Sequence, residues 1–201
     1  MSSQKSKNQI LVPPPPELTQ FEKEFLLRMT RSVLQEKLGG VPYTEDPPSA
    51  PALSETAGVF VTLYTDHDLR GCIGQIESNK PLWKCTREMT IAAATRDPRF
   101  NPIKPGELSG IRVEISILGP LVSVEPSRRD PRADFLELGE HGVQISLGNK
   151  SGLLLPQVAE KFDWDAVHFI EETALKAGLE SSAWLDKSTD LKLFRALRFQ
   201  K

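Results

Sequence analysis

The order of periodic segments along the chain constrains its fold more than any other feature of the sequence. Apolar residues recur every fourth position from Phe21 to Val33, which predicts a helix. Val113–Ile117 alternates strictly between apolar and polar residues, which predicts a strand. The predicted elements follow in the order helix, hairpin, helix, strand, strand, helix, strand. This order favours an α+β fold, with antiparallel or mixed strand pairing, over a doubly wound parallel sheet.

Capping and turn residues set the limits of these elements. The first helix begins after a capping box of Thr19 and Glu22, and the glycine pair at 39–40 ends it. Asp163 is the expected N-cap of a last helix that closes at Gly178. The other predicted elements are a hairpin with arms at 59–64 and 69–76, a helix from 81 to about 95, a short helix opened by residues 130–131, strands at 142–147 and 152–155, and a C-terminal strand at 191–199.

The chain of 201 residues is long enough for one sizeable core, or for one core with a small appended lobe. Residues 1–16 end in the proline run Pro13–Pro16 and offer few apolar side chains to bury. We therefore expect a disordered polar tail at residues 1–16, followed by a single folded domain at residues 17–201.

Charge and composition exclude several classes of protein. The formal net charge is −2, so the chain as a whole has no electrostatic attraction to nucleic acid or to an anionic membrane. Its apolar runs fall short of the roughly 18 residues of a transmembrane helix, and Ile10–Val12 is too short for the hydrophobic region of a signal peptide. Two cysteines, Cys72 and Cys85, do not make a secreted disulfide framework. We expect a cytoplasmic protein without a membrane partner.

The segment LRGCIG at 69–74 places two glycines around a thiol, which is unusual for a strand that serves packing alone. Alternation puts Arg70, Cys72 and Gly74 on one face of the strand, with Arg70 about 7 Å from Cys72 along the backbone. One interpretation is a reactive thiol beside an arginine that binds anions, with Gly74 leaving room for a ligand. The other is a buried cysteine packed beside a glycine bulge. Cys85 lies on an apolar helix stripe, where we expect a protonated, unreactive thiol.

LRGCIG also resembles the signature of the AMMECR domain family, which includes the AMME-syndrome candidate protein and its bacterial and archaeal relatives. AAATRDPRFNPI at 92–103, VEISIL at 113–118, GEHGV at 139–143, GLLLPQVA at 152–159 and KAGL at 176–179 are similar to further blocks of that family, in the same order. The resemblance covers residues 18 to 199. It implies a two-lobed α/β domain with the signature blocks around a cleft between the lobes. It also implies Memo-type and radical SAM proteins as partners, because prokaryotic relatives accompany them.

Three residues have the chemical types needed for nucleophilic catalysis: Cys72 as thiolate, His141 as base and Glu114 as the group that orients the base. Glu114 lies mid-strand, where a carboxylate faces either solvent or a cleft. His141 precedes a strand, where an ordinary loop histidine is the alternative. Candidate binding residues are Arg70, Gly71, Gly74, Asp97 and Arg99, of which Asp97 and Arg99 either pair with each other or brace Arg70.

Metal, cofactor and nucleic-acid sites find weaker support. Cys72 and Cys85 lack zinc-site spacing, and glycine-rich phosphate loops are missing, so we predict no bound metal and no cofactor. Basic residues cluster in two places: Lys192, Arg195, Arg198 and Lys201 near the C-terminus, and Arg128, Arg129 and Arg132. Such clusters usually form a solvent-exposed charged face, and RNA binding is the less common interpretation.

Two hypotheses of function follow, and the sequence leaves open which is correct and whether the protein is an enzyme. In the first, the chain is an AMMECR-family modification enzyme acting through the LRGCIG motif with Memo-type and radical SAM partners. In the second, the same cleft belongs to a non-catalytic module that binds a protein or a nucleic acid.

Overall fold

A computed structural model describes residues 10–40, 42–43, 47, 49–66, 68–125 and 132–201. Its mixed α+β architecture, with antiparallel strand pairing, confirms the predicted fold class. The chain divides into two compact units, which are described one at a time. Unit 1 comprises Met1–Pro14 and Gly119–Ala196, and unit 2 comprises Pro15–Leu118 and Leu197–Lys201.

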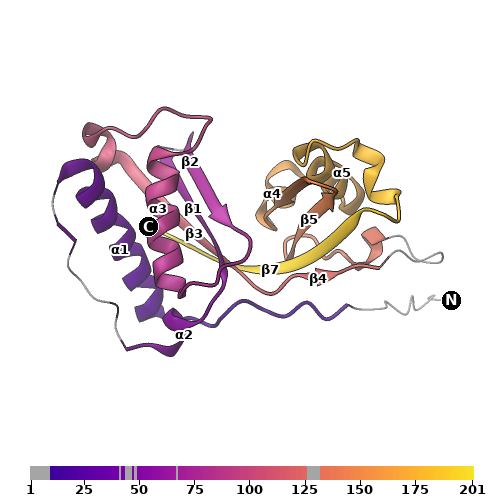
Figure 1. Ribbon diagram of the computed structural model, residues 1–201, viewed down its shortest axis with the longest axis horizontal. Helices are drawn as coiled ribbons and strands as arrows, with labels where there is room; N and C mark the ends of the chain where they lie inside the picture. Colours follow the sequence, from indigo (N-terminus) through magenta and orange to yellow (C-terminus); the bar gives the residue numbers. More distant parts are fainter. Residues whose placement is uncertain (1–9, 41, 44–46, 48, 67, 126–131) are drawn as a thin grey trace. The chain divides into compact units, whose positions relative to one another are not determined.

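Unit 2 contains an antiparallel sheet with two long helices on one of its faces (Figure 1). Its elements are α1 (Gln20–Gly39), α2 (Pro51–Ser54), β1 (Gly58–Thr65), β2 (Asp68–Gln75), α3 (Leu82–Thr95), the 3-10 helix η1 (Pro105–Gly110) and β3 (Ile111–Leu118). The strand β7 (Asp190–Gln200) begins in unit 1, and its last residues belong to unit 2. There, Val113 and Lys201 exchange main-chain hydrogen bonds of 3.1 and 3.0 Å.

The start of α1 follows the sequence closely. Thr19 accepts a hydrogen bond from the main-chain N–H of Glu22, and the Glu22 carboxylate accepts one from the N–H of Thr19, so the predicted capping box is confirmed. Gly40 ends the helix in the left-handed region at φ 72°, which glycine adopts without a steric penalty.

The strands of unit 2 have one apolar face and one mixed face. Val59, Val61 and Leu63 of β1 are fully buried and pack in one core with α1 and α3. Burial of each such side chain contributes about 1.5–3 kcal/mol, so this inner face fixes the register of the sheet. The outer face carries the intervening residues of β1, among them Thr62 and Tyr64.

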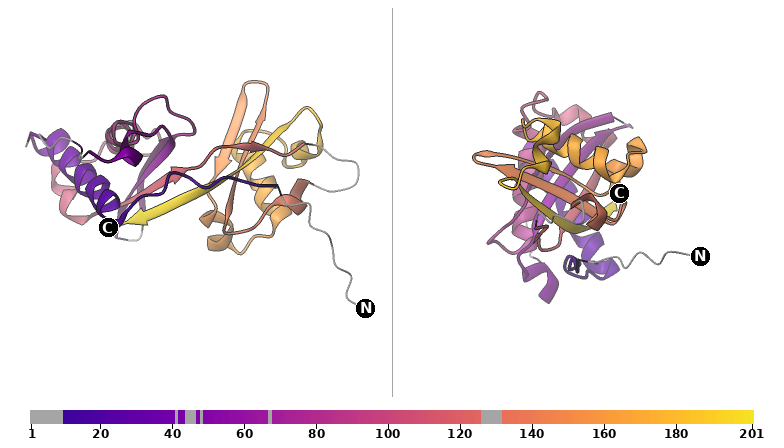
Figure 2. Two further views of the ribbon diagram at one scale, coloured as in Figure 1. Left: turned by 90° about the horizontal axis from the view of Figure 1, so that it is seen from below. Right: turned by 90° about the vertical axis from the view of Figure 1, so that its right-hand side faces the viewer.

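Unit 1 has its own core beneath an antiparallel sheet. Its elements are β4 (Val122–Ser123), the 3-10 helix η2 (Arg132–Phe135), β5 (His141–Leu147), β6 (Lys150–Leu154), α4 (Gln157–Phe162), α5 (Ala166–Lys176), the 3-10 helix η3 (Ser181–Leu185) and most of β7. β5 pairs with both β6 and β7, and Figure 2 shows the β5–β6 hairpin in orange. Phe169 and Ile170 of α5 are fully buried in this core with Val143 and Leu193.

The prediction of one helix capped by Asp163 is wrong. Asp163 ends α4 with a left-handed backbone at φ 53°, and its N–H binds the carbonyls of Ala159 and Glu160. The N-cap of α5 is Asp165, whose side chain accepts a hydrogen bond from the N–H of His168. Both aspartates suit a cap, and the apolar pattern alone does not choose between them. The short helix expected from residues 130–131 opens outside the described residues, and η2 follows directly after them.

The expectation of a tail without apolar contacts does not hold at Val12. This residue is 4% exposed and belongs to the core of unit 1, with Ile10 packed against the same cluster. Leu11, between them, is 86% exposed, so the segment alternates as an extended chain laid on unit 1. Residues 1–9 lie outside the described part of the chain, and the boundary between residues 16 and 17 stays a prediction.

Candidate functional site

Cys72 lies on β2, the edge strand of the unit 2 sheet, and its neighbour Arg70 does not follow the regular alternation. Leu63 pairs with Gly71 and Tyr64 pairs with Leu69, so Arg70 is the extra residue of a β-bulge. A bulge redirects the side chain, and here the guanidinium contacts η1.

The Arg70 guanidinium is occupied by partners other than the thiol. It donates to the Glu107 carboxylate at 2.8 and 3.1 Å and to the carbonyl of Asn101 at 2.9 Å. These hydrogen bonds lower the pKa of Glu107. The regular alternation that would place Arg70 on the same face as Cys72 therefore fails at the bulge, while its role as a binding residue stays a prediction.

Close packing explains both glycines of the motif. A Cβ atom on Gly71 would lie 2.3 Å from the carbonyl oxygen of Ala93, so Gly71 lets α3 approach β2. A Cβ atom on Gly74 would lie 2.3 Å from the ring of Phe60, its cross-strand partner. The expectation that Gly74 leaves room for a ligand does not hold in this structure, because the ring of Phe60 fills the space above its Cα atom.

Asp97 and Arg99 clamp the main chain of Cys72 from the turn that follows α3. The Asp97 carboxylate accepts a hydrogen bond of 2.8 Å from the N–H of Cys72, and Arg99 donates one of 3.2 Å to the carbonyl of Cys72. Arg99 also binds Asp97 at 2.7 and 3.0 Å, so the alternative in which the two residues pair with each other is confirmed. Edge strands present unpaired main-chain groups, and this clamp satisfies two of them at the thiol.

The electrostatics of the clamp favour the charged carboxylate. Hydrogen bonds from Arg99, followed by those from the main-chain N–H groups of Cys72 and Arg99, lower the pKa of Asp97 to about 2, although burial opposes this. The side chain of Asp97 is 2% exposed, so its charge is compensated by the arginine and the main chain instead of by water.

Cys72, Thr62 and Glu114 form one row across three strands on the outer face. Thr62 pairs with Cys72 on one side and with Glu114 on the other. Its hydroxyl donates to the Cys72 sulfur at 3.3 Å. Strands lie about 4.8 Å apart, which puts Cys72 and Glu114 roughly 10 Å apart at their backbones, with Thr62 between them.

Glu114 was expected to face either solvent or a cleft, and the structure shows that it does not face solvent. Its side chain is 6% exposed, and its Oε2 lies 3.6 Å from the Arg198 guanidinium, which is 49% exposed. A buried carboxylate requires such a partner, because an isolated charge out of water is costly. The outer face therefore combines a thiol, a hydroxyl and a compensated carboxylate.

Tyr64 and Ser116 belong to the same face, although the sequence alone did not single them out. Burial, then the negative charge of Glu114, raises the pKa of Tyr64, so its hydroxyl keeps a proton at neutral pH. The Ser116 hydroxyl is buried and has no hydrogen-bond partner among the described residues. The same period-two alternation that places Thr62 and Glu114 on this face could have identified both.

Comparison with known proteins adds the family to this geometry. The AMMECR1 family profile matches residues 27–199. The chain belongs to the AMMECR1 family. A protein of Methanopyrus kandleri is 40% identical over 187 residues, which cover 92% of this chain and 90% of the relative. A protein of Methanothermobacter thermautotrophicus is 39% identical over 188 residues, covering 92% and 96%.

The crystal structure of an uncharacterized protein from Pyrococcus horikoshii has the same fold. It is similar to this chain with a TM-score of 0.85 and 37% sequence identity, over 92% of this chain and 93% of that one. The predicted AMMECR resemblance is thus confirmed by sequence and by structure.

His141 lies in the other compact unit of this AMMECR1 family member, at the start of β5. It is 2% exposed, and its Nδ1 accepts a hydrogen bond of 3.1 Å from the N–H of Glu137. Burial lowers the pKa of His141, which favours the neutral imidazole. These contacts give His141 a role in holding the turn before β5, while its predicted role as a base stays untested.

The basic clusters are largely occupied by internal partners. Arg132 is buried and donates to the carbonyls of Thr189 and Asp186 at 2.8 and 2.9 Å. Cations of the C-terminal cluster pair with carboxylates, in the pairs Lys192–Asp190, Arg195–Glu137 and Arg198–Glu114. Arg128 and Arg129 lie outside the described residues. The described cations therefore lend little support to the nucleic-acid hypothesis.

An exposed aromatic stack in unit 1 was not foreseen. The rings of Phe162 and Trp164 stack at 4.9 Å, and His168 lies 5.1 Å from Trp164. Asp163 and Asp165 are exposed beside them and would repel a phosphate backbone.

The described part of the chain has neither a membrane-spanning helix nor a cluster of metal-ligating side chains. Within it, no helix combines the length and the apolar character needed to cross a bilayer. The same residues hold no group of three histidine, cysteine or acidic side chains positioned for a metal ion. The absence of a metal and of a cofactor stays a prediction.

Proposed function

We propose that this AMMECR1 family member is a cytoplasmic modification enzyme whose reactive group is the Cys72 thiol, acting with Memo-type and radical SAM proteins. The observation that carries the proposal is the row of Cys72, Thr62 and Glu114 on the outer face of the unit 2 sheet. The family resemblance supports the partners, and the geometry supports the thiol.

The surroundings of the two cysteines differ in the way that reactivity requires. Cys72 is half-buried, whereas Cys85 is fully buried in the core of unit 2, and burial raises the pKa of Cys85. The clamp of Asp97 and Arg99 fixes the main chain at Cys72, which limits the positions that the sulfur can take.

The step proposed is nucleophilic substitution at an electrophilic carbon of the substrate. A bond forms between the Cys72 sulfur and that carbon while the bond from the carbon to its leaving group breaks. The proton lost by the thiol ends on the leaving group. Tyr64, which retains its proton, is suited to donate to the leaving group and to be reprotonated at the expense of the thiol.

Competitive alkylation tests the reactive thiol directly. Limiting iodoacetamide at neutral pH, followed by peptide mass mapping, should label Cys72 at least ten times faster than Cys85, which serves as a control within the same molecule. Thr62→Val should change the rate at Cys72 and leave the rate at Cys85 unaltered. Equal labelling of the two thiols would remove the nucleophile from the proposal.

Covalent capture separates an enzyme from a binding module. The protein should be incubated with the small-molecule fraction of cells and analysed by intact mass, in parallel with the Cys72→Ser and Cys85→Ser variants. We expect an adduct that the Cys72→Ser variant lacks and the Cys85→Ser variant retains. A folded protein without an adduct at Cys72 would favour the non-catalytic binding module. Co-purification with Memo-type and radical SAM proteins tests the partners.

A further inference from the structure

The main-chain groups of β2 that face away from the unit 2 sheet alternate along this edge strand. In an antiparallel pair, the N–H and C=O of one residue both point toward the partner strand, and those of the next residue both point away. At Cys72 both point away from β1, because they bind the side chains of Asp97 and Arg99. The register between β1 and β2 is regular over residues 71–75, so the N–H and C=O of Gly74 also point to the open edge.

The outward groups of Gly74 lack the partners that those of Cys72 have. Neither its N–H nor its C=O bonds to a side chain or a loop among the residues that the structure describes. Gly74 is only partly buried, and a glycine has no side chain, so its exposed area consists of main-chain atoms. The edge therefore offers one unpaired donor and one unpaired acceptor, two residues along β2 from the thiol.

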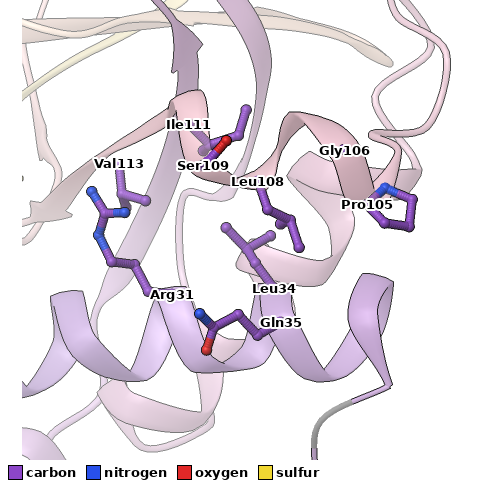
Figure 3. Close-up of a pocket in the computed structure, with 9 residues that line it drawn as sticks. All are labelled: Arg31, Leu34, Gln35, Pro105, Gly106, Leu108, Ser109, Ile111 and Val113. Carbon is purple, nitrogen blue, oxygen red and sulfur yellow. The ribbon is translucent and has the colours of Figure 1, made fainter.

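Packing accounts for the missing side chain of Gly74 but not for its open main chain. A Cβ atom there would clash with the Phe60 ring. That ring lies above the face of the sheet, whereas the N–H and C=O of Gly74 lie in its plane. The open edge is also distinct from a pocket of about 470 Å³ in the same unit, whose lining residues come from α1, η1 and β3 (Figure 3).

This arrangement fits one residue of an extended polypeptide. In antiparallel pairing, two residues that face each other exchange both hydrogen bonds, so a single open residue is enough for a bridge. The rest of the sheet pairs in this antiparallel manner. Addition of an extended peptide to an exposed sheet edge is a general mode of peptide recognition, in which the main chain supplies the affinity.

The clamp at Cys72 determines where such a peptide continues. Asp97 and Arg99 occupy the edge at Cys72, so the peptide cannot extend past Gly74 in the plane of the sheet. α3 packs on the inner face of β2. The peptide is therefore directed to the outer face, where the Cys72 sulfur lies. Gly74 and Cys72 are about 7 Å apart along β2, a distance that two residues of an extended peptide span.

We propose that the substrate of the Cys72 thiol is an extended polypeptide segment of another protein, held by an antiparallel main-chain bridge to Gly74. The reacting carbon lies about two residues to the carboxyl side of the residue that faces Gly74. The binding step depends on the open edge alone. The reaction of the bound peptide rests on the function proposed above, and the bonds made and broken are those of that substitution.

Amide hydrogen exchange, measured by ¹H–¹⁵N NMR, tests the open edge without reference to the thiol. The N–H of Ile73 points toward β1, so the N–H of Gly74 should exchange about one hundred times faster, after correction for intrinsic rates. Equal protection of the two amides would overturn the proposal. Protection of Gly74 that rises with protein concentration would also overturn it, because two copies of the chain would then pair through their own edges.

A reactive peptide tests delivery to Cys72 on the full chain. The probe is the blocked peptide acetyl-Ala-Val-Ala-Dap amide, in which the side chain of the diaminopropionate (Dap) carries a chloroacetyl group. When Val faces Gly74, this group reaches the thiol, the sulfur–carbon bond forms, chloride leaves, and the thiol proton passes to solvent. We expect alkylation of Cys72 about ten times faster than by chloroacetamide, with no acceleration at Cys85, because the bridge adds two hydrogen bonds.

Matched probes identify the bridge. N-methylation of Val removes the donor that faces Gly74 and should reduce the rate to that of chloroacetamide. N-methylation of the following Ala removes a donor that points away from β2, so the acceleration should remain. Transfer of the chloroacetyl group to the amino end should abolish the acceleration, because an antiparallel peptide then holds the group away from the thiol.

The donor of the protein is removed by Gly74→Pro. Because a Cβ atom at this position meets the Phe60 ring, the substitution is made together with Phe60→Ala. Proline is tolerated on an edge strand where its nitrogen faces outward. The acceleration should be lost in the Phe60→Ala/Gly74→Pro protein and kept in the Phe60→Ala protein, and the melting temperatures show whether both fold.

Failure of this proposal is distinguishable from failure of the proposed function. If chloroacetamide labels Cys72 no faster than Cys85, the thiol is not the reactive group and the proposed function fails. If chloroacetamide prefers Cys72 but the peptide and its N-methyl-Val form react at equal rates, the reactive thiol stands and the peptide substrate is refuted. Acceleration that is lost on N-methylation of Val, and kept on N-methylation of the following Ala, supports the bridge.

Discussion

Replacement of Gly71 by alanine tests whether this glycine serves packing or the thiol. The added Cβ atom would lie 2.3 Å from the carbonyl oxygen of Ala93 and 3.2 Å from its carbonyl carbon, both of which belong to the main chain of α3. A change of side-chain rotamer cannot relieve this clash, because the position of Cβ is fixed by the main chain and the oxygen of Ala93 is a main-chain atom. The strand and the helix must therefore move apart by nearly 1 Å, because a carbon–oxygen contact needs somewhat more than 3 Å.

This separation loosens the core between β2 and α3, where Cys85 and Ala93 are nearly fully buried. Overpacking of a well-packed core costs about 1–3 kcal/mol, and the main-chain position of the clash places Gly71→Ala near the upper end. We expect a loss of about 2–3 kcal/mol in the free energy of unfolding. For a chain of this size, that corresponds to a fall of about 4–10 °C in melting temperature.

Urea unfolding followed by tryptophan fluorescence measures this loss, since Trp83 on α3 packs against the affected core. Gly110→Ala is the matched control, because a Cβ atom there meets nothing within 4 Å and should change the free energy of unfolding by less than about 0.5 kcal/mol. A Gly71→Ala protein as stable as the Gly110→Ala protein would refute the packing explanation. The glycine would then have to be explained by the needs of the thiol site.

Two further predictions concern the clamp and the N-terminal segment. Because the folded pKa of Asp97 is lowered from 3.8 to about 2, its contribution to stability is complete above about pH 4 and is lost as the pH falls toward 2. Asp97→Asn should therefore lower the free energy of unfolding by up to about 2 kcal/mol at pH 7, and the variant should lose less stability than the parent protein as the pH falls from 4 to 2. An equal loss of stability over this pH range in both proteins would contradict the clamp. Val12→Ala should lower the free energy of unfolding by about 1 kcal/mol, because Val12 is buried. Leu11→Ala, at an 86% exposed position, should leave it unchanged. Equal effects of the two substitutions would show that the segment does not pack on unit 1.

Local patterns predicted the elements of this fold well. The capping box at Thr19, the alternation of Val113–Ile117 and the hairpin around residue 66 each express a preference of neighbouring residues, and each appears in the structure. The division between α4 and α5 was not predicted, because Asp163 and Asp165 are equally good caps and the choice depends on packing in unit 1.

The candidate site was predicted in its residue types but not in its contacts. Alternation correctly placed Glu114 mid-strand on the face opposite to Val113 and Ile115, yet it failed for Arg70, because a bulge depends on the pairing with β1. The partners Glu107 and Asn101 lie more than thirty residues away from Arg70 in the sequence, and a single sequence does not reveal such contacts.

The contacts of Arg70 and Arg99 connect the LRGCIG segment to the turn after α3 and to η1. An edge strand has no further strand beside it, so its outward main-chain groups need other partners. The turn after α3 supplies such partners from Asp97 and Arg99, and η1 holds Arg70 through Glu107. Both arginines thus hold the strand in place from its two flanks, while the Thr62 hydroxyl donates a hydrogen bond to the sulfur. It follows that charge changes at Arg70 should alter the stability of unit 2 more than the alkylation rate of Cys72, whereas changes at Thr62 should do the reverse.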